Sequence, residues 1–154
     1  MKKRKNLILG IIIALVLVTA ILAVLHLNTR TQEQAGTLQI GYNGGTISLT
    51  LAELPAYDVS GTTIDGKGEK KQVEAKGTLV SDVLTQAGVD LSTIQQVTVK
   101  ASDEFYAVLT VEDVSQPDKA YLIQEDGEEW PRLVVFGDPD SKRKVKEVVR
   151  LEVE

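Results

Sequence analysis

The sequence predicts a mixed α+β domain, made mainly of β-strands and carried on one N-terminal transmembrane helix. Three observations lead to this fold class. Residues 7–27 contain no Asp, Glu, Lys or Arg. Beyond them, short runs rich in β-branched and aromatic residues alternate with Gly, Pro, Asn and Asp, which is typical of strands and turns. Only residues 77–88 place apolar side chains at helical spacing between a start and a stop signal.

The apolar segment predicts a membrane anchor. Its 21 residues would form about 31 Å of α-helix, which matches the thickness of a bilayer core. The basic sequence MKKRK precedes it, and such residues stay on the cytoplasmic side. A cleaved signal peptide is the alternative, although no small-x-small site closes the run. We therefore expect a single-pass protein of the cell membrane, with a cytoplasmic tail at 1–6, an anchor at 7–27, a linker at 28–36 and an extracytoplasmic domain at 37–154.

Charge and missing residue types exclude several classes of function. The net charge is −5, and four of the 17 basic residues precede the anchor. The other 13 face 22 acidic residues, a net of −9, which disfavours nucleic acid as a partner. The chain has no cysteine, and its single histidine, His26, lies in the apolar segment. We therefore expect no disulfide, no cysteine nucleophile, no Cys/His zinc site and no histidine-based triad in the domain.

The first part of the domain predicts three strands. Strand 37–42 runs into Asn43-Gly44-Gly45, residues that accept the positive φ of a tight hairpin turn. A phosphate-binding loop is the alternative, but neither Lys-Ser/Thr nor a helix follows. The second strand carries Ile47, Leu49 and Leu51 in alternation. Thr50 and Glu53 then predict a capping box for one helical turn, before a third strand at 57–64 and a charged hairpin tip at 65–71.

The central stretch at 77–114 predicts a helix and two strands. Thr78 can cap the start of the helix, and Gly88 stands where a left-handed residue would end it. Strands follow at 94–99 and 105–111, and Glu112-Asp113 form a turn. The apolar residues at helical spacing are Leu79, Val80, Val83, Leu84 and Ala87.

The last part predicts three more strands. A short strand at 120–124 lies between turns at 116–119 and 125–127. The apolar run RLVVF at 132–136 predicts a buried strand, because no polar residue interrupts it after the arginine. A turn at 138–142 leads to the final strand. Five alternating residues of that strand are expected to face the core: Val145, Glu147, Val149, Leu151 and Val153.

Taken in order, the motifs TLAELP, KGTLVSDVLTQAGV, VTVKASDEFYAVLTVEDV, WPRLVVF and KVKEVVRLEV extend over about 46–153. This succession resembles the molybdopterin-binding domain of sulfite-oxidase-type oxidoreductases. The resemblance implies that fold and a molybdopterin cofactor. It also places four residues at cofactor-binding positions, of which Arg132 and Lys146 would lie near the pterin phosphate. The four are Ser102, Asp103, Arg132 and Lys146.

The chain departs from this family at the positions of its metal-binding and cofactor-binding residues. In the catalytic members a cysteine ahead of the helix motif ligates molybdenum, whereas residues 56–76 contain neither Cys nor His. Lys76 stands in place of a tryptophan and Glu104 in place of a glycine. The resemblance therefore implies a domain without catalytic residues or cofactor, which binds a ligand or a protein partner in the cell envelope. The alternatives are a molybdopterin-dependent oxidoreductase subunit, with metal held without cysteine or supplied by a partner chain, and a structural surface domain.

Three groups of side chains are candidates for binding or catalysis. Arg132 and Lys146, with Arg150 further along the same strand, could clamp an anion; ordinary surface ion pairs are the alternative. Carboxylates near the central strands could supply a general acid and base, although helix ends and turns also favour them: Asp82, Asp103, Glu104, Glu112 and Asp113. Four aromatic residues alternate with polar neighbours and suit core packing or a strand face, with a platform for a flat ligand as the alternative: Phe105, Tyr106, Tyr121 and Trp130.

Overall fold

The computed structural model describes residues 12–22 and 36–154, and residues 12–22 form a helix. The chain divides into two compact units, Met1–Gln34 and Ala35–Glu154. Within the described ranges, no helix has both the length and the apolar character needed to cross a membrane. The predicted tail, both ends of the predicted anchor and nearly all of the predicted linker lie outside the described residues. The anchor and the membrane location therefore stay predictions.

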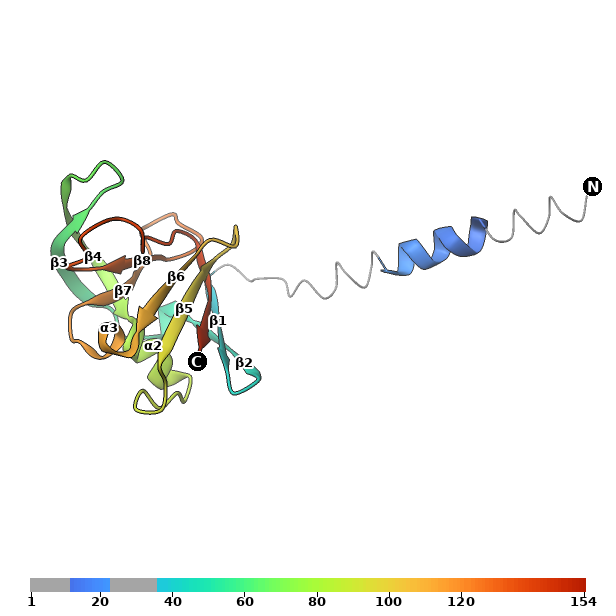
Figure 1. Ribbon diagram of the computed structural model, residues 1–154, viewed down its shortest axis with the longest axis horizontal. Coiled ribbons are helices and arrows are strands. Elements are labelled where there is room, and N and C mark those ends of the chain that lie inside the picture. Colours follow the sequence, from blue (N-terminus) through green and yellow to red (C-terminus); the bar gives the residue numbers. More distant parts are fainter. Residues whose placement is uncertain (1–11, 23–35) are drawn as a thin grey trace, which may run out of the picture. The chain divides into compact units, whose positions relative to one another are not determined.

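The second unit is a mixed α+β domain composed mostly of strands, as predicted, and its strands form two sheets (Figure 1). The five-stranded sheet has the order β2-β1-β9-β5-β6, and the four-stranded sheet has the order β3-β4-β7-β8. The strands of the first are β1 (Thr37–Tyr42), β2 (Gly45–Thr50), β5 (Gln96–Ala101), β6 (Tyr106–Thr110) and β9 (Val148–Val153). Those of the second are β3 (Tyr57–Ile64), β4 (Lys70–Leu79), β7 (Ala120–Ile123) and β8 (Arg132–Val135).

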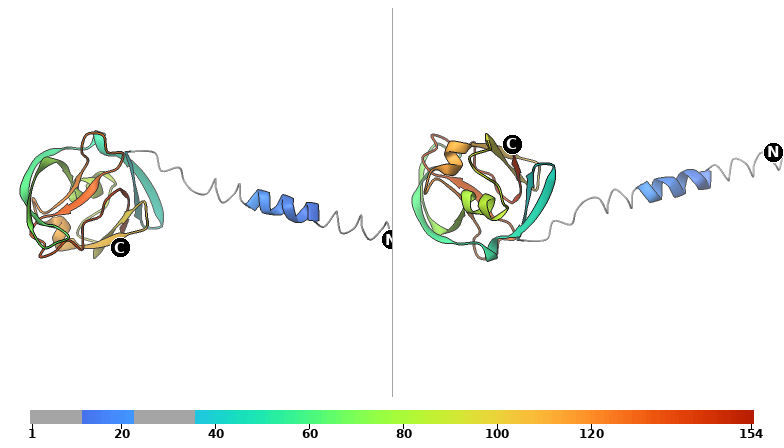
Figure 2. Two further views of the ribbon diagram at one scale, coloured as in Figure 1. Left: turned by 90° about the horizontal axis from the view of Figure 1, so that it is seen from above. Right: turned by 90° about the horizontal axis from the view of Figure 1, so that it is seen from below.

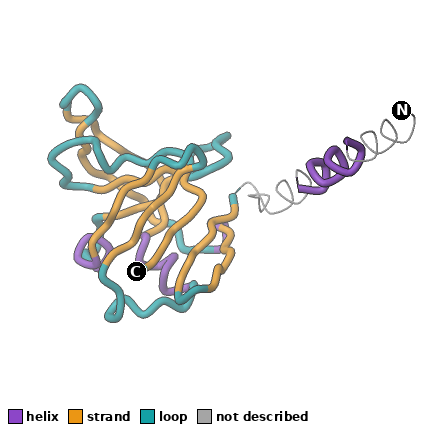
Figure 3. The backbone as a smooth tube through the Cα atoms, turned by 45° about the vertical axis from the view of Figure 1, so that its right-hand side comes forward, coloured by secondary structure: helices purple, strands orange, loops and turns teal. Residues whose placement is uncertain are grey.

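Three short helical segments complete the domain: η1 (Leu51–Glu53), α2 (Val80–Gln86) and α3 (Val111–Ser115). Helices α2 and α3 contact each other and lie close together in the right-hand view of Figure 2. Figure 3 shows the strands running side by side with loops gathered at their ends. The functional residues discussed below come from those loops and from the strand ends beside them.

The main core joins both sheets to the helices. It takes alternate residues of the five-stranded sheet, such as Ile40, Val99 and Leu151, all with no exposed surface. Leu122 and Leu133 enter it from the four-stranded sheet. Burying a side chain of this size stabilises the fold by about 1.5–3 kcal/mol. Because these residues alternate along β1 and β5, the residues between them lie on the other face of the sheet and are half-buried.

A second cluster covers the other face of the four-stranded sheet. Its buried members are Val59, Tyr121, Ile123 and Val134, and Phe136 packs against them. Strand β7 is consequently buried on both faces, and three of the four residues of β8 are buried. This agrees with the buried strand predicted from RLVVF.

The hairpins of the first part form where they were predicted. Strands β1 and β3 have the predicted bounds, and Asn43 and Gly44 turn the chain with φ of 49° and 76°. At the tip of the β3–β4 hairpin, the carboxylate of Asp65 accepts hydrogen bonds from the backbone N–H groups of Lys67 and Glu69, at 2.8 and 2.9 Å. Local turn chemistry is sufficient to specify both features.

The predicted start of the central helix is wrong. Thr78 belongs to β4, where it lies opposite Leu122 and is only 3% exposed. Leu79 precedes the first turn of α2, and no side chain caps that turn. The strand pairing with β7 holds Thr78 in extended conformation, so tertiary contacts override the local capping preference. The end of the helix is as predicted, with Gly88 at φ 77°.

The capping box is also at a different place. Thr50 precedes η1 but makes no capping hydrogen bond with its side chain. The box forms instead at Thr110 and Asp113, where a turn was predicted and α3 begins. Both segments carry the pattern of Thr followed three residues later by an acidic residue. Only the second continues into an α-helical turn, where the backbone N–H groups need partners.

The final strand is shorter than predicted, and its side chains do not alternate between core and solvent as predicted. It begins at Val148, because Glu147 has a φ of 51° and is exposed rather than in the core. The pairing of β5 with β9 is irregular next to Ala101, and Val148 and Val149 are both buried. A bulge of this kind shifts the alternation of side chains by one residue. The inward-facing set predicted from strict alternation is therefore wrong at Glu147.

Candidate functional site

A cavity of about 370 Å³ lies where the start of β8 meets the chain leading into β9. Its volume is in the range of small-molecule sites. We call it the Trp130 cavity. Six residues line it: Glu128, Glu129, Trp130, Arg132, Lys146 and Glu147. The two cationic residues predicted to bind an anion are thus brought to one place, although 14 positions separate them in the sequence.

Backbone pairing explains how Arg132 comes to face Lys146. The N–H of Leu133 donates to the carbonyl of Val145 at 2.8 Å, and the N–H of Val148 donates to that of Pro131 at 2.7 Å. Between these antiparallel hydrogen bonds, Arg132 alone stands opposite two residues, Lys146 and Glu147. The extra residue makes a bulge, and the positive φ of Glu147 accommodates it. Bulges re-aim side chains, and here the result is two charged groups directed to one cavity.

The turn that carries Glu128 and Glu129 supplies another part of the lining. The side-chain amide of Gln124 donates to both of their carbonyls, at 2.9 and 3.3 Å. The carbonyl of Glu129 also accepts the N–H of Gly36 at 3.1 Å. The two glutamates are therefore held on a fixed backbone beside Trp130, which favours a preformed site over one that must order on binding.

The charges around the Trp130 cavity are mixed. Arg132 binds the carboxylate of Glu125 through one terminal nitrogen, while its buried Nε has no acceptor among the described residues. Lys146 forms no ion pair within the described part of the chain. Three glutamates line the same cavity as these two cations. The two cations of the predicted anion clamp therefore line one cavity, but three carboxylates line it as well.

The other residues predicted to bind a cofactor are placed differently. Ser102 lies beside the cavity wall, where its hydroxyl donates to Glu147 at 2.6 Å and its N–H donates to the Glu147 carbonyl at 3.0 Å. Asp103 does not line the cavity; its carboxylate accepts the N–H of Phe105 at 3.0 Å and shapes the β5–β6 turn. Arg150 does not line it either. Its side chain binds Glu152 and Gln39 on the five-stranded sheet.

The carboxylates considered for acid–base chemistry have separate local roles. Asp82 accepts the hydroxyl of Tyr57 at 2.8 Å, and this hydrogen bond raises the pKa of Tyr57. Asp103 stabilises a turn, and Asp113 belongs to an ion network described next. Glu104 and Glu112 are exposed. None of the five lines the Trp130 cavity.

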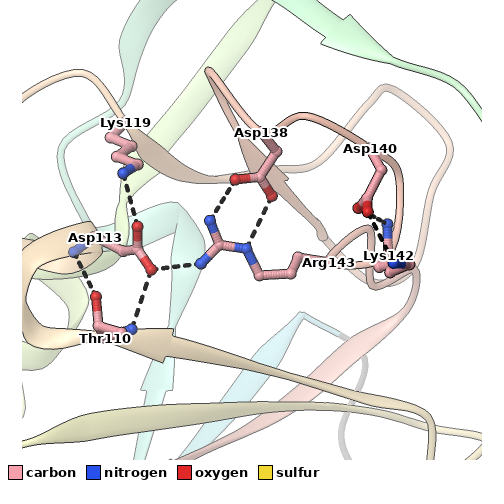
Figure 4. A network of polar contacts seen from close by, with 7 residues as sticks. All are labelled: Thr110, Asp113, Lys119, Asp138, Asp140, Lys142 and Arg143. Carbon is pink, nitrogen blue, oxygen red and sulfur yellow. Dashed lines mark hydrogen bonds and ion pairs between the residues drawn. The ribbon is translucent and has the colours of Figure 1, made fainter. Parts of the chain in front are cut away.

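A partly buried ion network ties α3 to the loop between β8 and β9 (Figure 4). Asp113 accepts Lys119 Nζ at 2.7 Å and also binds Arg143, whose guanidinium forms two hydrogen bonds with Asp138. Burial opposes ionisation of Asp113, but the hydrogen bonds from Arg143 and Lys119 outweigh it and hold its pKa well below the usual range. Each charge in the network has a partner of opposite sign, which makes it a structural clamp.

The aromatic residues divide between packing, exposure and the cavity. Tyr121 is 3% exposed and packs edge-to-face against Phe136 with ring centroids 6.0 Å apart. Burial and a hydrogen bond to Asp118 raise the pKa of Tyr121 to about 12. Phe105 and Tyr106 are 49% and 60% exposed, so of the predicted alternatives core packing does not apply to them, and Tyr106 lies on the exposed face of β6. Trp130 lines the cavity, as a platform for a ligand would.

Sequence reasoning missed the acidic half of the site. None of the sequence-based predictions singles out Glu128 and Glu129, and the alternation predicted for the final strand has Glu147 facing the core. A local signal was present, because the charged turn EDGEE leads directly into Trp130 and a buried strand. No local signal shows that this turn faces Lys146, since the pairing that joins them spans segments separated in sequence.

No protein-family model matches the chain, and no curated protein matches it. The fold and the cavity therefore define it only as a mixed α+β domain with a ligand-sized cavity of mixed charge.

The donor set of the cavity does not fit a molybdenum centre. Its lining supplies carboxylates, an ammonium, a guanidinium and an indole, and the chain has no cysteine. Molybdenum in the resembling family is held by a thiolate, and soft sulfur ligands select such metals. Three carboxylates would also repel the phosphate of a pterin.

Proposed function

We propose that this protein is a membrane-anchored, extracytoplasmic binding module without catalytic competence, related in fold to the molybdopterin-binding domain of sulfite-oxidase-type oxidoreductases. The observation that carries the proposal is the convergence of Arg132, Lys146 and Trp130 on one cavity of about 370 Å³. Two cations and an aromatic ring give a ligand both a charge to pair with and a surface to pack on.

The residue inventory supports a binding role over a catalytic one. Outside the apolar segment the chain has neither cysteine nor histidine, which removes the commonest nucleophiles and proton-transfer groups at neutral pH. The carboxylates with perturbed pKa values, Asp113 above all, are engaged in turns and ion pairs rather than in the cavity. Binding, by contrast, needs only the charged groups and the ring that line the cavity.

The proposal is tested on the full-length chain, expressed in a host that makes molybdopterin. We expect the chain to sediment with membranes and to be released only by detergent. Elemental mass spectrometry should then find no stoichiometric molybdenum, and the oxidised sample should lack pterin fluorescence. Metal and pterin at about one per chain would overturn the non-catalytic proposal in favour of the oxidoreductase subunit. Recovery in the soluble fraction would argue against the anchor.

A further inference from the structure

We propose that the Trp130 cavity selects a zwitterionic small molecule, one that carries a carboxylate and an ammonium group on the same short chain. This inference rests on the proposed ligand-binding function and adds the class of ligand. It follows from which charged groups at the cavity are already satisfied by the protein and which are free to meet a ligand.

Several of the lining groups are engaged within the protein. Glu147 accepts the hydroxyl of Ser102 at 2.6 Å. One carboxylate oxygen of Glu128 accepts the backbone N–H of Glu125 at 3.3 Å. Arg132 gives one terminal nitrogen to Glu125. These contacts hold the walls of the cavity in place. The atoms that make them have fewer free positions for a hydrogen bond with a ligand.

The remaining groups have opposite charges. Among the described residues, the side chains of Lys146 and Glu129 have no hydrogen-bond or ion-pair partner, and both are exposed where they line the cavity. The Nε of Arg132 is buried without an acceptor. Because that nitrogen has essentially no exposed surface, a ligand in the cavity would pair with the rest of the Arg132 guanidinium. Lys146 and Arg132 therefore suit a carboxylate, and Glu129 suits an ammonium.

The charge balance disfavours ligands that carry only anionic groups. Three glutamates and two cationic residues line the cavity, so its own charge is net negative. A phosphate or a dicarboxylate would pair with the cations but would bring its second charge close to glutamates, and like charges in proximity cost free energy. A zwitterion avoids this repulsion. The indole of Trp130 can also attract an ammonium through its ring face.

Trp130 provides a direct readout, because it is the only tryptophan of the chain. Its emission would be followed in the full-length protein in detergent while four probes are titrated: 6-aminohexanoate, hexanoate, hexylamine and inorganic phosphate. The first three share a six-carbon chain and differ only in their charged ends. We expect 6-aminohexanoate to bind about two- to fivefold more tightly than hexanoate or hexylamine, the gain expected from one exposed ion pair.

Two variants test the assignment of each charge. Glu129→Gln should remove the advantage of 6-aminohexanoate over hexanoate, because the ammonium group loses its partner and hexanoate is no longer repelled by this carboxylate. Lys146→Gln should remove its advantage over hexylamine, because the carboxylate of the probe loses its partner and hexylamine is no longer repelled by this ammonium. The matched controls are Glu74→Gln and Lys76→Gln, which change exposed charges on β4 away from the cavity and should leave all titrations unchanged.

The outcomes separate the class of ligand from the binding function itself. If hexanoate or phosphate binds as tightly as 6-aminohexanoate, the zwitterion proposal is overturned and the cavity is a simple anion site. If none of the four probes changes Trp130 emission at millimolar concentration, both the zwitterion proposal and the ligand-binding role of the cavity are overturned. A preference for the zwitterion that both variants abolish supports the two proposals together.

Discussion

Gly61 has no side chain, and this leaves room for the ring of Phe136, which packs against the second cluster of the four-stranded sheet. A Cβ atom at this position would lie 2.6 Å from two ring carbons of Phe136. Real Cβ atoms do not come so close to other carbons, so the ring occupies space that only glycine leaves free. Phe136 follows β8 and Gly61 lies in β3, so this contact joins the two edge strands of the sheet.

We therefore expect Gly61→Ala to destabilise the domain by about 1–3 kcal/mol, as overpacked cores do. The matched control is Gly66→Ala at the hairpin tip, where a Cβ would meet nothing within 4 Å. That change should alter the free energy of unfolding by less than about 0.5 kcal/mol. Urea unfolding of both variants measures the difference. Equal stabilities would show that Phe136 moves aside without cost.

Asp113 is the second residue on which the fold depends. It is 6% exposed and faces two cationic side chains, Lys119 and Arg143. Asp113→Asn keeps the shape but leaves Lys119 without its anion and Arg143 with Asp138 alone, so we expect a loss of about 2–4 kcal/mol in urea unfolding at neutral pH. Asp140→Asn is the control, since its ion pair with Lys142 is exposed and should be worth less than about 1 kcal/mol. A neutral Asp113→Asn variant would contradict the role of the network.

At the scale of elements, α3 shows a short helix that depends on its cap. It has five residues, too few to be stable alone, and begins with a capping box between Thr110 and Asp113. The N–H of Asp113 donates to the Thr110 hydroxyl at 3.2 Å, and the N–H of Thr110 donates to the Asp113 carboxylate at 3.1 Å. The same carboxylate also binds Lys119 and Arg143, so Asp113 belongs both to the capping box and to the ion network.

Thr110→Ala should therefore cost about 1 kcal/mol, the usual value of an N-cap side chain. Thr50→Ala offers a natural comparison, because Thr50 stands at the sequence-predicted capping box but makes no capping hydrogen bond. We expect the Thr50 change to cost less than about 0.5 kcal/mol. Thermal unfolding of the two variants under identical conditions measures both. A larger loss at Thr50 than at Thr110 would contradict this assignment.

At the scale of the whole molecule, the network predicts how stability depends on pH. Because the folded pKa of Asp113 is depressed, its ionised form stabilises the fold at pH values above the unfolded pKa of about 4. That contribution is lost as the pH falls from about 5 toward the folded pKa. Asp65, Asp90, Asp140 and Glu152 also have lowered pKa values, and they add to the same trend.

We therefore expect the melting temperature to fall steadily between about pH 5 and pH 2. Asp113→Asn should show a shallower fall, because it has already lost the largest of these contributions. Calorimetry of the wild type and the variant across this range provides the measurement. Parallel curves would mean that Asp113 does not dominate the acid dependence.

The sequence alone determined the features that depend on neighbouring residues. The β1–β2 turn needs only Asn43 and Gly44, the helix end needs only Gly88, and the burial of β8 follows from its uninterrupted apolar run. Mixed fold class and mainly β content follow from the same local patterns. Such signals are strong because turn geometry and side-chain periodicity act within a few residues.

Only the tertiary structure decided where Thr78 lies, which threonine caps a helix, and how the final strand is phased. It also decided the candidate site. The resemblance described in the sequence analysis predicted Arg132 and Lys146, but the bulge at Glu147 and the glutamates of the turn at 128–129 give the cavity its charge. These features depend on hydrogen bonds between segments far apart in the chain, and no local pattern of residues encodes which distant partner will satisfy them.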